Sequence, residues 1–296
     1  MDLAHLMTEQ HRPELADLDL RPTVDLVRLI ADDQAHAQEA VAAVAESLAV
    51  VVDAVVERLR RGGRLIYVGA GTAGRLGLID AAECPPTFNT DQVIAVMAGG
   101  REAFLVSGEE EEDDAAAGAA DVDRIGVVER DAVVGVAASG RTPYTVGAVV
   151  RAGELGAVTV GVSCNPDATL SRHVDHPIEV VVGAEVIAGS TRLKAGSAQK
   201  TVLNVLSTVS MVRLGKTFGN LMVDVRATND KLRDRARRIV LQATGAKLES
   251  VNRALTQADG EVKVAILTLL TGASVDHARQ RLAAHRGAVR PALKGR

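Results

Sequence analysis

The chain has 296 residues, of which 47% are hydrophobic but only 2% are aromatic, and it has no tryptophan. A core of Ala, Val, Leu and Ile is typical of helices packed on a buried parallel sheet. The net charge of −4 does not favour a nucleic acid or an anionic membrane as a partner, and no apolar run has the length of a membrane-spanning helix.

The N-terminus and the cysteines indicate the cellular compartment. MDLAHLMTEQHRPEL has acidic residues and no basic region before an apolar stretch, so it is not typical of a signal peptide. Cys84 and Cys164 form neither a disulfide framework nor a zinc pattern. His173 and His176 lie three residues apart but lack a matching pair of carboxylates, so they do not predict a metal site. We expect a cytoplasmic protein without a bound metal.

The first part of the chain has a helical pattern. Residues 1–23 are polar and contain two prolines, which is typical of a loop. Over residues 24–61, apolar residues recur every three or four positions, and the pattern ends at a Gly-Gly pair. We therefore expect an N-terminal helical segment over residues 1–61.

Strands and helices alternate over the next part of the chain. Val-rich runs are typical of buried strands, and helical patterns separate most of them. The expected strands are 65–70, 93–98, 132–138, 157–163 and 178–183, and the expected helices are 74–84, 101–120, 143–156 and 190–214. This order predicts an α/β domain over residues 62–228, with a parallel five-stranded sheet sandwiched by helices.

The strands stop after about residue 229, and short helical patterns follow. Three of these patterns end at a glycine, which commonly closes a helix. We expect a small all-helical C-terminal domain over residues 229–296.

Two of the expected strands end in similar small, polar turns. The first turn is GAGT at 69–72, and the second is SGRT at 139–142, followed by Pro143. In each turn the threonine stands at the expected N-cap of the next helix, and Pro143 falls at the first helical position. Free N–H groups and the positive end of a helix dipole attract an anion at such a place.

These turns do not match the common nucleotide-binding motifs. No acidic residue closes the second strand after GAGTAG, which disfavours a dinucleotide, and GxxxxGK[ST] is absent. A turn that merely connects a strand to a helix is the alternative for each. The remaining ligand class is a small phosphate ester, and its candidate contacts are Gly71, Thr72, Ser139, Gly140, Arg141 and Thr142.

Long, ordered blocks of sequence run from about Met7 to the C-terminal helices. They are GRLIYVGAGTAGRLGLIDAAECPPTF, VMAGGREAF, AASGRTPY, SCNP, GAEVIAGSTRLKAGSAQKTVLN and FGNLMVDVRATNDKL. These blocks closely resemble the N-acetylmuramic acid 6-phosphate etherase family, which has the sugar-isomerase (SIS) fold. A weaker resemblance is to the glucokinase regulatory protein, which shares the fold but binds rather than cleaves.

The etherase resemblance implies a lyase that cleaves the D-lactyl ether of N-acetylmuramic acid 6-phosphate. The products are N-acetylglucosamine 6-phosphate and D-lactate, and the reaction serves the recycling of cell-wall peptidoglycan. The resemblance also implies a homodimer that needs no metal or other cofactor, and a site with two catalytic glutamates.

The first catalytic glutamate of the family lies in an AECPP block and corresponds to Glu83. The second lies in an EGAED block, which this chain does not preserve, because four consecutive glutamates fill the place. Counting without gaps from Gly100 gives Glu112, and a slip of two residues gives Glu110.

Two carboxyl groups in opposite protonation states suffice to cleave this ether. The aldehyde at C1 of the open-chain sugar acidifies the C2 proton, so a base removes that proton while an acid protonates the departing oxygen at C3. We expect Glu83 to be the acid, buried in the last turn of a helix that ends before Pro85 and Pro86. Mutual repulsion in the acidic run favours Glu112 as the base, although such runs are usually solvated helix starts. The two roles are open to exchange.

Three further candidates for sugar contacts follow the fifth expected strand: Glu185, Ser190 and Lys194. The alternatives are a turn residue at Glu185, a helix cap at Ser190 and a solvent-facing Lys194. Two rival functions are a non-catalytic sugar-phosphate-binding regulator and an aldose–ketose isomerase, and the intact AAECPP block favours the etherase. The sequence leaves open which turn binds the phosphate and whether two subunits share one site.

Overall fold

The structure is a computed structural model, and it describes residues 5–100, 102–105, 110–225 and 230–294. The chain divides into two compact units, Met1–Ala82 with Gln92–Ser207, and Glu83–Asp91 with Thr208–Arg296. The N-terminal segment groups with the sheet in this division. The boundary expected between residues 228 and 229 lies outside the described residues.

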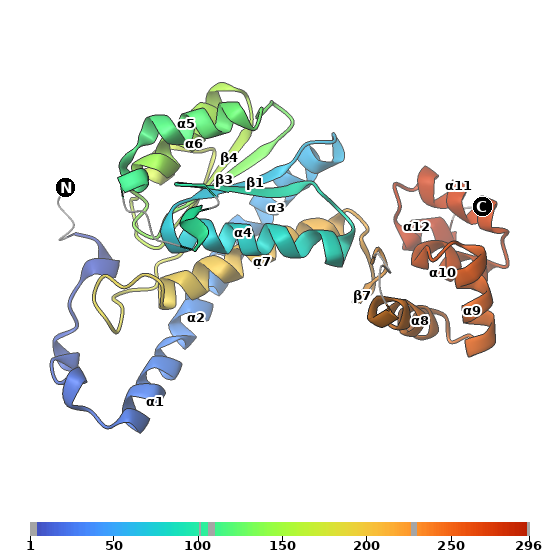
Figure 1. The fold of residues 1–296 in the computed structure, drawn as a ribbon, viewed down its shortest axis with the longest axis horizontal. Helices are drawn as coiled ribbons and strands as arrows, with labels where there is room; N and C mark the ends of the chain where they lie inside the picture. The colour runs from blue at the N-terminus through green and yellow to red at the C-terminus, as the bar shows by residue number, and fades with distance from the viewer. Residues whose placement is uncertain (1–4, 101, 106–109, 226–229, 295–296) are drawn as a thin grey trace. The chain divides into compact units, whose positions relative to one another are not determined.

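A five-stranded parallel sheet forms the centre of the first unit, in the order β2-β1-β3-β4-β5 (Figure 1). The α/β architecture expected from the sequence is confirmed. The strands are β1 (Leu65–Gly69), β2 (Val93–Met97), β3 (Ala132–Val136), β4 (Val158–Ser163) and β5 (His176–Glu179).

Helices cover both faces of this sheet (Figure 1). One face carries α5 (Ala115–Arg124) and α6 (Pro143–Glu154), and the other carries α3 (Ala45–Arg60), α4 (Gly71–Phe88) and α7 (Lys194–Arg213).

The alternation of side chains along β1 explains both layers. Ile66 and Val68 belong to a buried cluster with Ala148 of α6. Tyr67 points to the opposite face, where its hydroxyl donates a hydrogen bond to the Asp80 carboxylate of α4 at 2.9 Å.

Three helices replace the single N-terminal pattern expected over 24–61. They are α1 (Thr23–Asp33), α2 (Ala35–Ala43) and α3, and short 3₁₀ turns precede them at Met7–Glu9, Pro13–Leu15 and Leu18–Leu20. The breaks fall at Gln34 and Val44. Neither is a glycine or a proline, so no local sequence signal marked them.

Three other boundaries also differ from the sequence-based expectation. β5 ends at Glu179, which pairs with the last residue of β4, so the expected strand over 178–183 is mostly a loop. The helix expected over 190–214 begins only at Lys194. The acidic stretch expected to be helical over 101–120 contains two 3₁₀ turns, Glu102–Phe104 and Glu110–Asp113, before α5 begins.

The second unit is helical around a small hairpin. Its described helices are α8 (Asp230–Thr244), α9 (Leu248–Gln257), α10 (Val262–Thr271), α11 (Val275–Ala284) and α12 (Val289–Lys294). Strands β6 (Thr217–Phe218) and β7 (Leu221–Met222) pair antiparallel and were not expected. α10 is central to the core, with Ile266 and Leu267 completely buried. In the described part of the chain, no helix is long and apolar enough to cross a membrane.

Candidate active site

The two polar turns leave the same edge of the sheet. β1 and β3 are parallel neighbours, and Gly69 lies opposite Val136 at their carboxyl ends. The chain continues from β1 into α4 and from β3 into α6. Ligands of open α/β sheets commonly bind outside the carboxyl ends of the strands, where these turns lie.

The second turn has the features of an anion site. Gly140 has a left-handed φ of +65°, and Ser139 Oγ accepts a hydrogen bond from the Arg141 N–H at 3.2 Å. Thr142 occupies the N-cap position of α6 and Pro143 its first position, as expected, but the Thr142 side chain makes no capping hydrogen bond. The first N–H groups of α6 therefore have no side-chain cap from Thr142 and can bind an anion.

The first turn lies beside Glu112. Helix α4 begins at Gly71, which has a φ of +52°, so Thr72 lies inside the first helical turn and the expectation that it is the N-cap is wrong. A Cβ placed on Gly71 would lie 2.7 Å from Glu112 Oε1. The Glu112 carboxylate therefore faces the start of α4, where the helix dipole favours a negative charge.

Helix α4 does not end where the sequence suggested. It continues through Pro85 and Pro86, and closes where Asn89 takes a left-handed φ of 49°. Each proline removes one helical N–H donor, and the carbonyl left without a partner belongs to the residue four positions earlier. For Pro86 that residue is the exposed Ala82, whose carbonyl water can satisfy, whereas for Pro85 it is Ala81, which is buried.

Glu83 has a different environment from the expected one. Its side chain is exposed in the isolated chain, so the expected burial is wrong. Glu83 follows Thr72 by eleven residues of one helix, a rise of about 16 Å. The structure thus brings Glu112 to the Gly71–Thr72 turn, and Glu83 lies about three turns further along α4.

Glu185 caps helix α7. Its carboxylate accepts hydrogen bonds from the N–H groups of Lys194 at 3.1 Å and Ala195 at 2.8 Å, and the residue is buried. Burial raises the pKa of Glu185, and these two N–H donors oppose that rise. Ser190, the expected alternative cap, lies before the helix and does not cap it.

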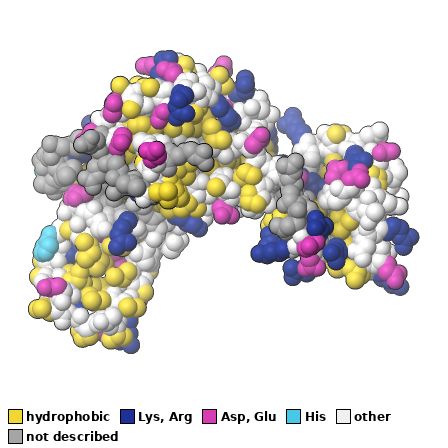
Figure 2. Space-filling view, viewed as in Figure 1, with side chains coloured by type: hydrophobic (Ala, Val, Ile, Leu, Met, Phe, Trp, Pro, Cys, Tyr) yellow, Lys and Arg dark blue, Asp and Glu magenta, His cyan; other side chains and the backbone are white. Residues whose placement is uncertain are grey.

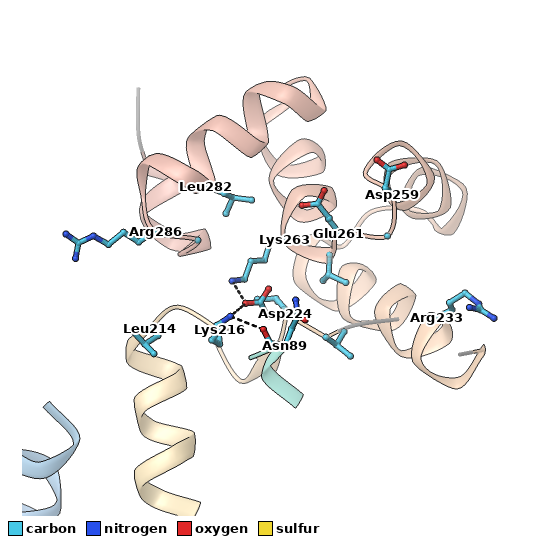
Figure 3. Close-up of a pocket in the computed structure, with 15 residues that line it drawn as sticks. Asn89, Leu214, Lys216, Asp224, Arg233, Asp259, Glu261, Lys263, Leu282 and Arg286 are labelled. Carbon is cyan, nitrogen blue, oxygen red and sulfur yellow. Dashed lines mark hydrogen bonds and ion pairs between the residues drawn. The ribbon is translucent and has the colours of Figure 1, made fainter. Parts of the chain in front are cut away.

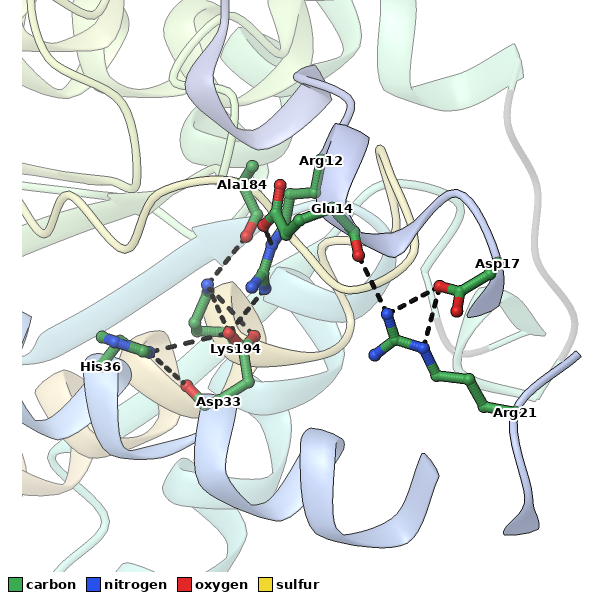
Figure 4. Close-up of polar contacts among 8 residues, drawn as sticks. All are labelled: Arg12, Glu14, Asp17, Arg21, Asp33, His36, Ala184 and Lys194. Carbon is green, nitrogen blue, oxygen red and sulfur yellow. Dashed lines mark hydrogen bonds and ion pairs between the residues drawn. The ribbon is translucent and has the colours of Figure 1, made fainter. Parts of the chain in front are cut away.

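Lys194 lies in a buried cluster of charges (Figure 4). Its Nζ donates to the Ala184 carbonyl at 2.8 Å and lies 3.1 Å from Asp33 Oδ2. Arg12 Nη1 lies 2.8 Å from the other carboxylate oxygen of Asp33. The alternative of a solvent-facing Lys194 is therefore wrong, and the cluster joins the N-terminal segment and α1 to the loop before α7.

The replacement Asp33→Ala is expected to lower the free energy of unfolding by about 3 kcal/mol, because it leaves the buried Lys194 ammonium without its carboxylate. Urea unfolding of the purified variant measures the change. Glu14→Ala is the matched control, since Glu14 also pairs with Arg12 but is exposed, and it should leave stability nearly unchanged. Equal stability of the two variants would contradict the assignment.

A cavity of about 420 Å³ opens beside Thr72. Residues of α2, α4, α7 and the loop before α7 line it: Gln38, Thr72, Leu76, Arg192, Gly196, Ser197, Lys200 and Thr201. Arg192 and Lys200 bring positive charge to this cavity, and Ser197 and Lys200 were not expected from the sequence. Their spacing of three places them on one face of a helix, and this spacing is the signal that identifies them.

The sheet order and the two polar turns at its carboxyl edge define an open, doubly wound α/β protein with a candidate ligand site where the strands end. Residues 47–152 match the family model of the glucokinase regulatory protein N-terminal SIS domain. A phosphoheptose isomerase from Francisella tularensis has the same fold, with a TM-score of 0.53 and 17% identity over 65% of this chain and 100% of that chain.

Two relatives are much closer in sequence. The N-acetylmuramic acid 6-phosphate etherase of Rubrobacter xylanophilus is 64% identical over 98% of this chain and 97% of its own length. That of Streptomyces avermitilis is 55% identical over 99% of this chain and 94% of its own length. The chain belongs to the N-acetylmuramic acid 6-phosphate etherase family and is a carbon–oxygen lyase, as its sequence blocks predicted.

Proposed function

We propose that this protein cleaves the D-lactyl ether of N-acetylmuramic acid 6-phosphate, and so serves the recycling of peptidoglycan amino sugars in the cytoplasm. The identity of 64% with a relative of that name, over nearly the whole chain, carries the proposal. The position of Glu112 at the carboxyl edge of the sheet supports it, because the chemistry requires a carboxylate beside the bound sugar.

The reaction is an elimination followed by a hydration. In the open-chain sugar, Glu112 takes the proton from C2, which the C1 aldehyde acidifies, and the C3–O bond breaks as Glu83 gives its proton to the departing oxygen. D-lactate leaves, and a C2–C3 double bond remains. Water then adds to this unsaturated aldehyde, with its hydroxyl at C3 and its proton at C2, and gives N-acetylglucosamine 6-phosphate.

The second turn is the proposed site of the 6-phosphate. The Glu112 carboxylate faces the start of α4, and a phosphate dianion placed there would be repelled. At the start of α6, the Thr142 side chain makes no capping hydrogen bond. The atoms nearest to a Cβ placed on Gly140 belong to Ala168 and Ser163, not to a carboxylate. With the phosphate at Ser139–Thr142, the sugar extends toward Gly71 and Thr72, where Glu112 can reach C2.

A homodimer that shares its sites is the proposed assembly. Glu83 is exposed and lies about 16 Å along α4 from Thr72, so a neighbouring copy is better placed than the same chain to supply it. Apolar side chains gather on the surface of the N-terminal helices (Figure 2). On α1, Val24 and Val27 are 52% and 62% exposed. A second copy of the chain that packs against α1 would bury these apolar side chains away from water.

Mixed dimers test both the reaction and the sharing. The single variants Glu83→Gln and Glu112→Gln are each expected to release almost no D-lactate from N-acetylmuramic acid 6-phosphate. When the two variants are refolded together, about half of the dimers are mixed and each has one intact shared site, so about a quarter of the wild-type rate should return. If the site lies within one chain, no activity returns. If the wild type binds the substrate but releases no D-lactate, the protein is a regulator and the etherase proposal fails.

A further inference from the structure

A second cavity lies within the C-terminal unit, and none of the residues proposed for catalysis lines it (Figure 3). Its volume is about 740 Å³, which is within the range of about 300–1,000 Å³ typical of small-molecule sites. The hairpin region, the start of α10 and the end of α11 contribute to its walls.

The centre of this cavity has more positive than negative charge. Lys216 Nζ and Lys263 Nζ each lie 2.9 Å from the same oxygen, Oδ2 of Asp224 (Figure 3). One carboxylate therefore serves two ammonium groups. The Lys263 side chain is only 11% exposed, and burial lowers the pKa of its ammonium, while the charge and hydrogen bond of Asp224 oppose that lowering.

The other acidic residues of the cavity do not cancel this charge. Asp259 and Glu261 form ion pairs with Arg279, at 3.0 and 2.7 Å. The arginines of the cavity wall, Arg233 and Arg286, point away from Asp224 in Figure 3. The excess positive charge therefore lies at the two lysines.

The start of α10 adds to the positive potential. Glu261 is at its N-cap position but makes no side-chain capping hydrogen bond, and Lys263 lies in the first helical turn. The first N–H groups of a helix have no partner within the helix, and the dipole there disfavours a cation and favours an anion. A bound anion would satisfy these N–H groups and also balance Lys263.

We propose that this cavity binds the phosphate group of a phosphate monoester through Lys216, Lys263 and the N–H groups at the start of α10. Asp224 pairs with both ammonium groups, so its charge is balanced and repels a phosphate less than an unpaired carboxylate would. Lys216 also donates to the Asn89 carbonyl at 3.5 Å, and with three N–H groups each ammonium keeps at least one donor for a phosphate oxygen. The site is separate from the proposed function, and neither proposal depends on the other.

The test is a titration of the ¹⁵N-labelled full chain with inorganic phosphate and, in a second arm, with N-acetylglucosamine 6-phosphate. We expect saturable shifts of the backbone amide signals of Gly260, Lys263 and Gly287, which line the cavity. Equal affinity in the two arms means that only the phosphate group is recognised, and tighter binding of the ester means that its sugar is recognised as well. The absence of saturable shifts at these amides in both arms overturns the proposal, whatever happens at the catalytic site.

Matched variants locate the binding. Lys263→Met should weaken phosphate binding at these amides at least about tenfold, since a charged hydrogen bond is lost. Asp224 still has Lys216 as a partner in this variant, and the Lys216→Met variant provides an independent second measurement. Lys247→Met, at an exposed position of the same unit, should bind phosphate as the wild type does. Wild-type affinity in both cavity variants contradicts the proposal.

Discussion

Replacement of Glu112 by Gln is expected to slow D-lactate release by about 10²–10⁴-fold, because an amide cannot accept the C2 proton. Glu83→Gln should cause a loss of similar size, because an amide cannot protonate the ether oxygen as it leaves. Each variant retains the shape of the side chain it replaces. The rate of D-lactate release under saturating substrate measures both effects.

Hydrogen exchange separates the two roles. When substrate is incubated with enzyme in D₂O, a variant that lacks only the acid can still exchange the C2 proton, whereas a variant that lacks the base cannot. We expect exchange without lactate release for Glu83→Gln, and neither process for Glu112→Gln. The opposite result would exchange the assigned roles. Glu111→Gln is the control, because Glu111 is exposed and adjacent in sequence, and it should retain the wild-type rate.

The sheet and its polar turns were predictable because their signals are local. The Val-rich runs marked β1 to β4 to within about two residues, and Pro143 marked the first position of α6. The end of α4 was mispredicted because the rule that proline stops a helix takes no account of water as a partner for the carbonyl that proline frees. Water can take the carbonyl of the exposed Ala82, which Pro86 leaves without a partner, although Ala81, four residues before Pro85, is buried.

The contacts of the site were less predictable because they join distant parts of the chain. Nothing near Lys194 in the sequence indicates Asp33, which lies 161 residues earlier and pairs with it in the interior. Glu112 was located only by counting along a family block, and no local pattern indicated that its carboxylate would lie against Gly71. Exposure of Glu83 was also hidden, since it depends on how far α4 continues.

The second large effect is expected for Gly140→Ala, which should lower the free energy of unfolding by about 4 kcal/mol, with contributions from a left-handed backbone and from overpacking. Gly140 has a φ of +65°, and a Cβ there would lie 2.4 Å from the Cβ of Ala168 and 3.0 Å from that of Ser163. Since Ala168 is buried, it cannot move aside without displacing its neighbours. The turn proposed to hold the 6-phosphate must therefore distort, and KM for the substrate should rise in whatever fraction folds.

Gly183→Ala separates backbone strain from the steric clash. Gly183 also has a left-handed φ, of +75°, but a Cβ there would have no atom within 4 Å. This control should lose only about 1–2 kcal/mol, the backbone contribution alone, and should keep the wild-type KM. Urea unfolding and initial rates of D-lactate release measure both variants. If Gly140→Ala is as stable as Gly183→Ala and has an unchanged KM, then close packing does not fix the shape of the second turn, and its proposed role as the phosphate site loses its structural basis.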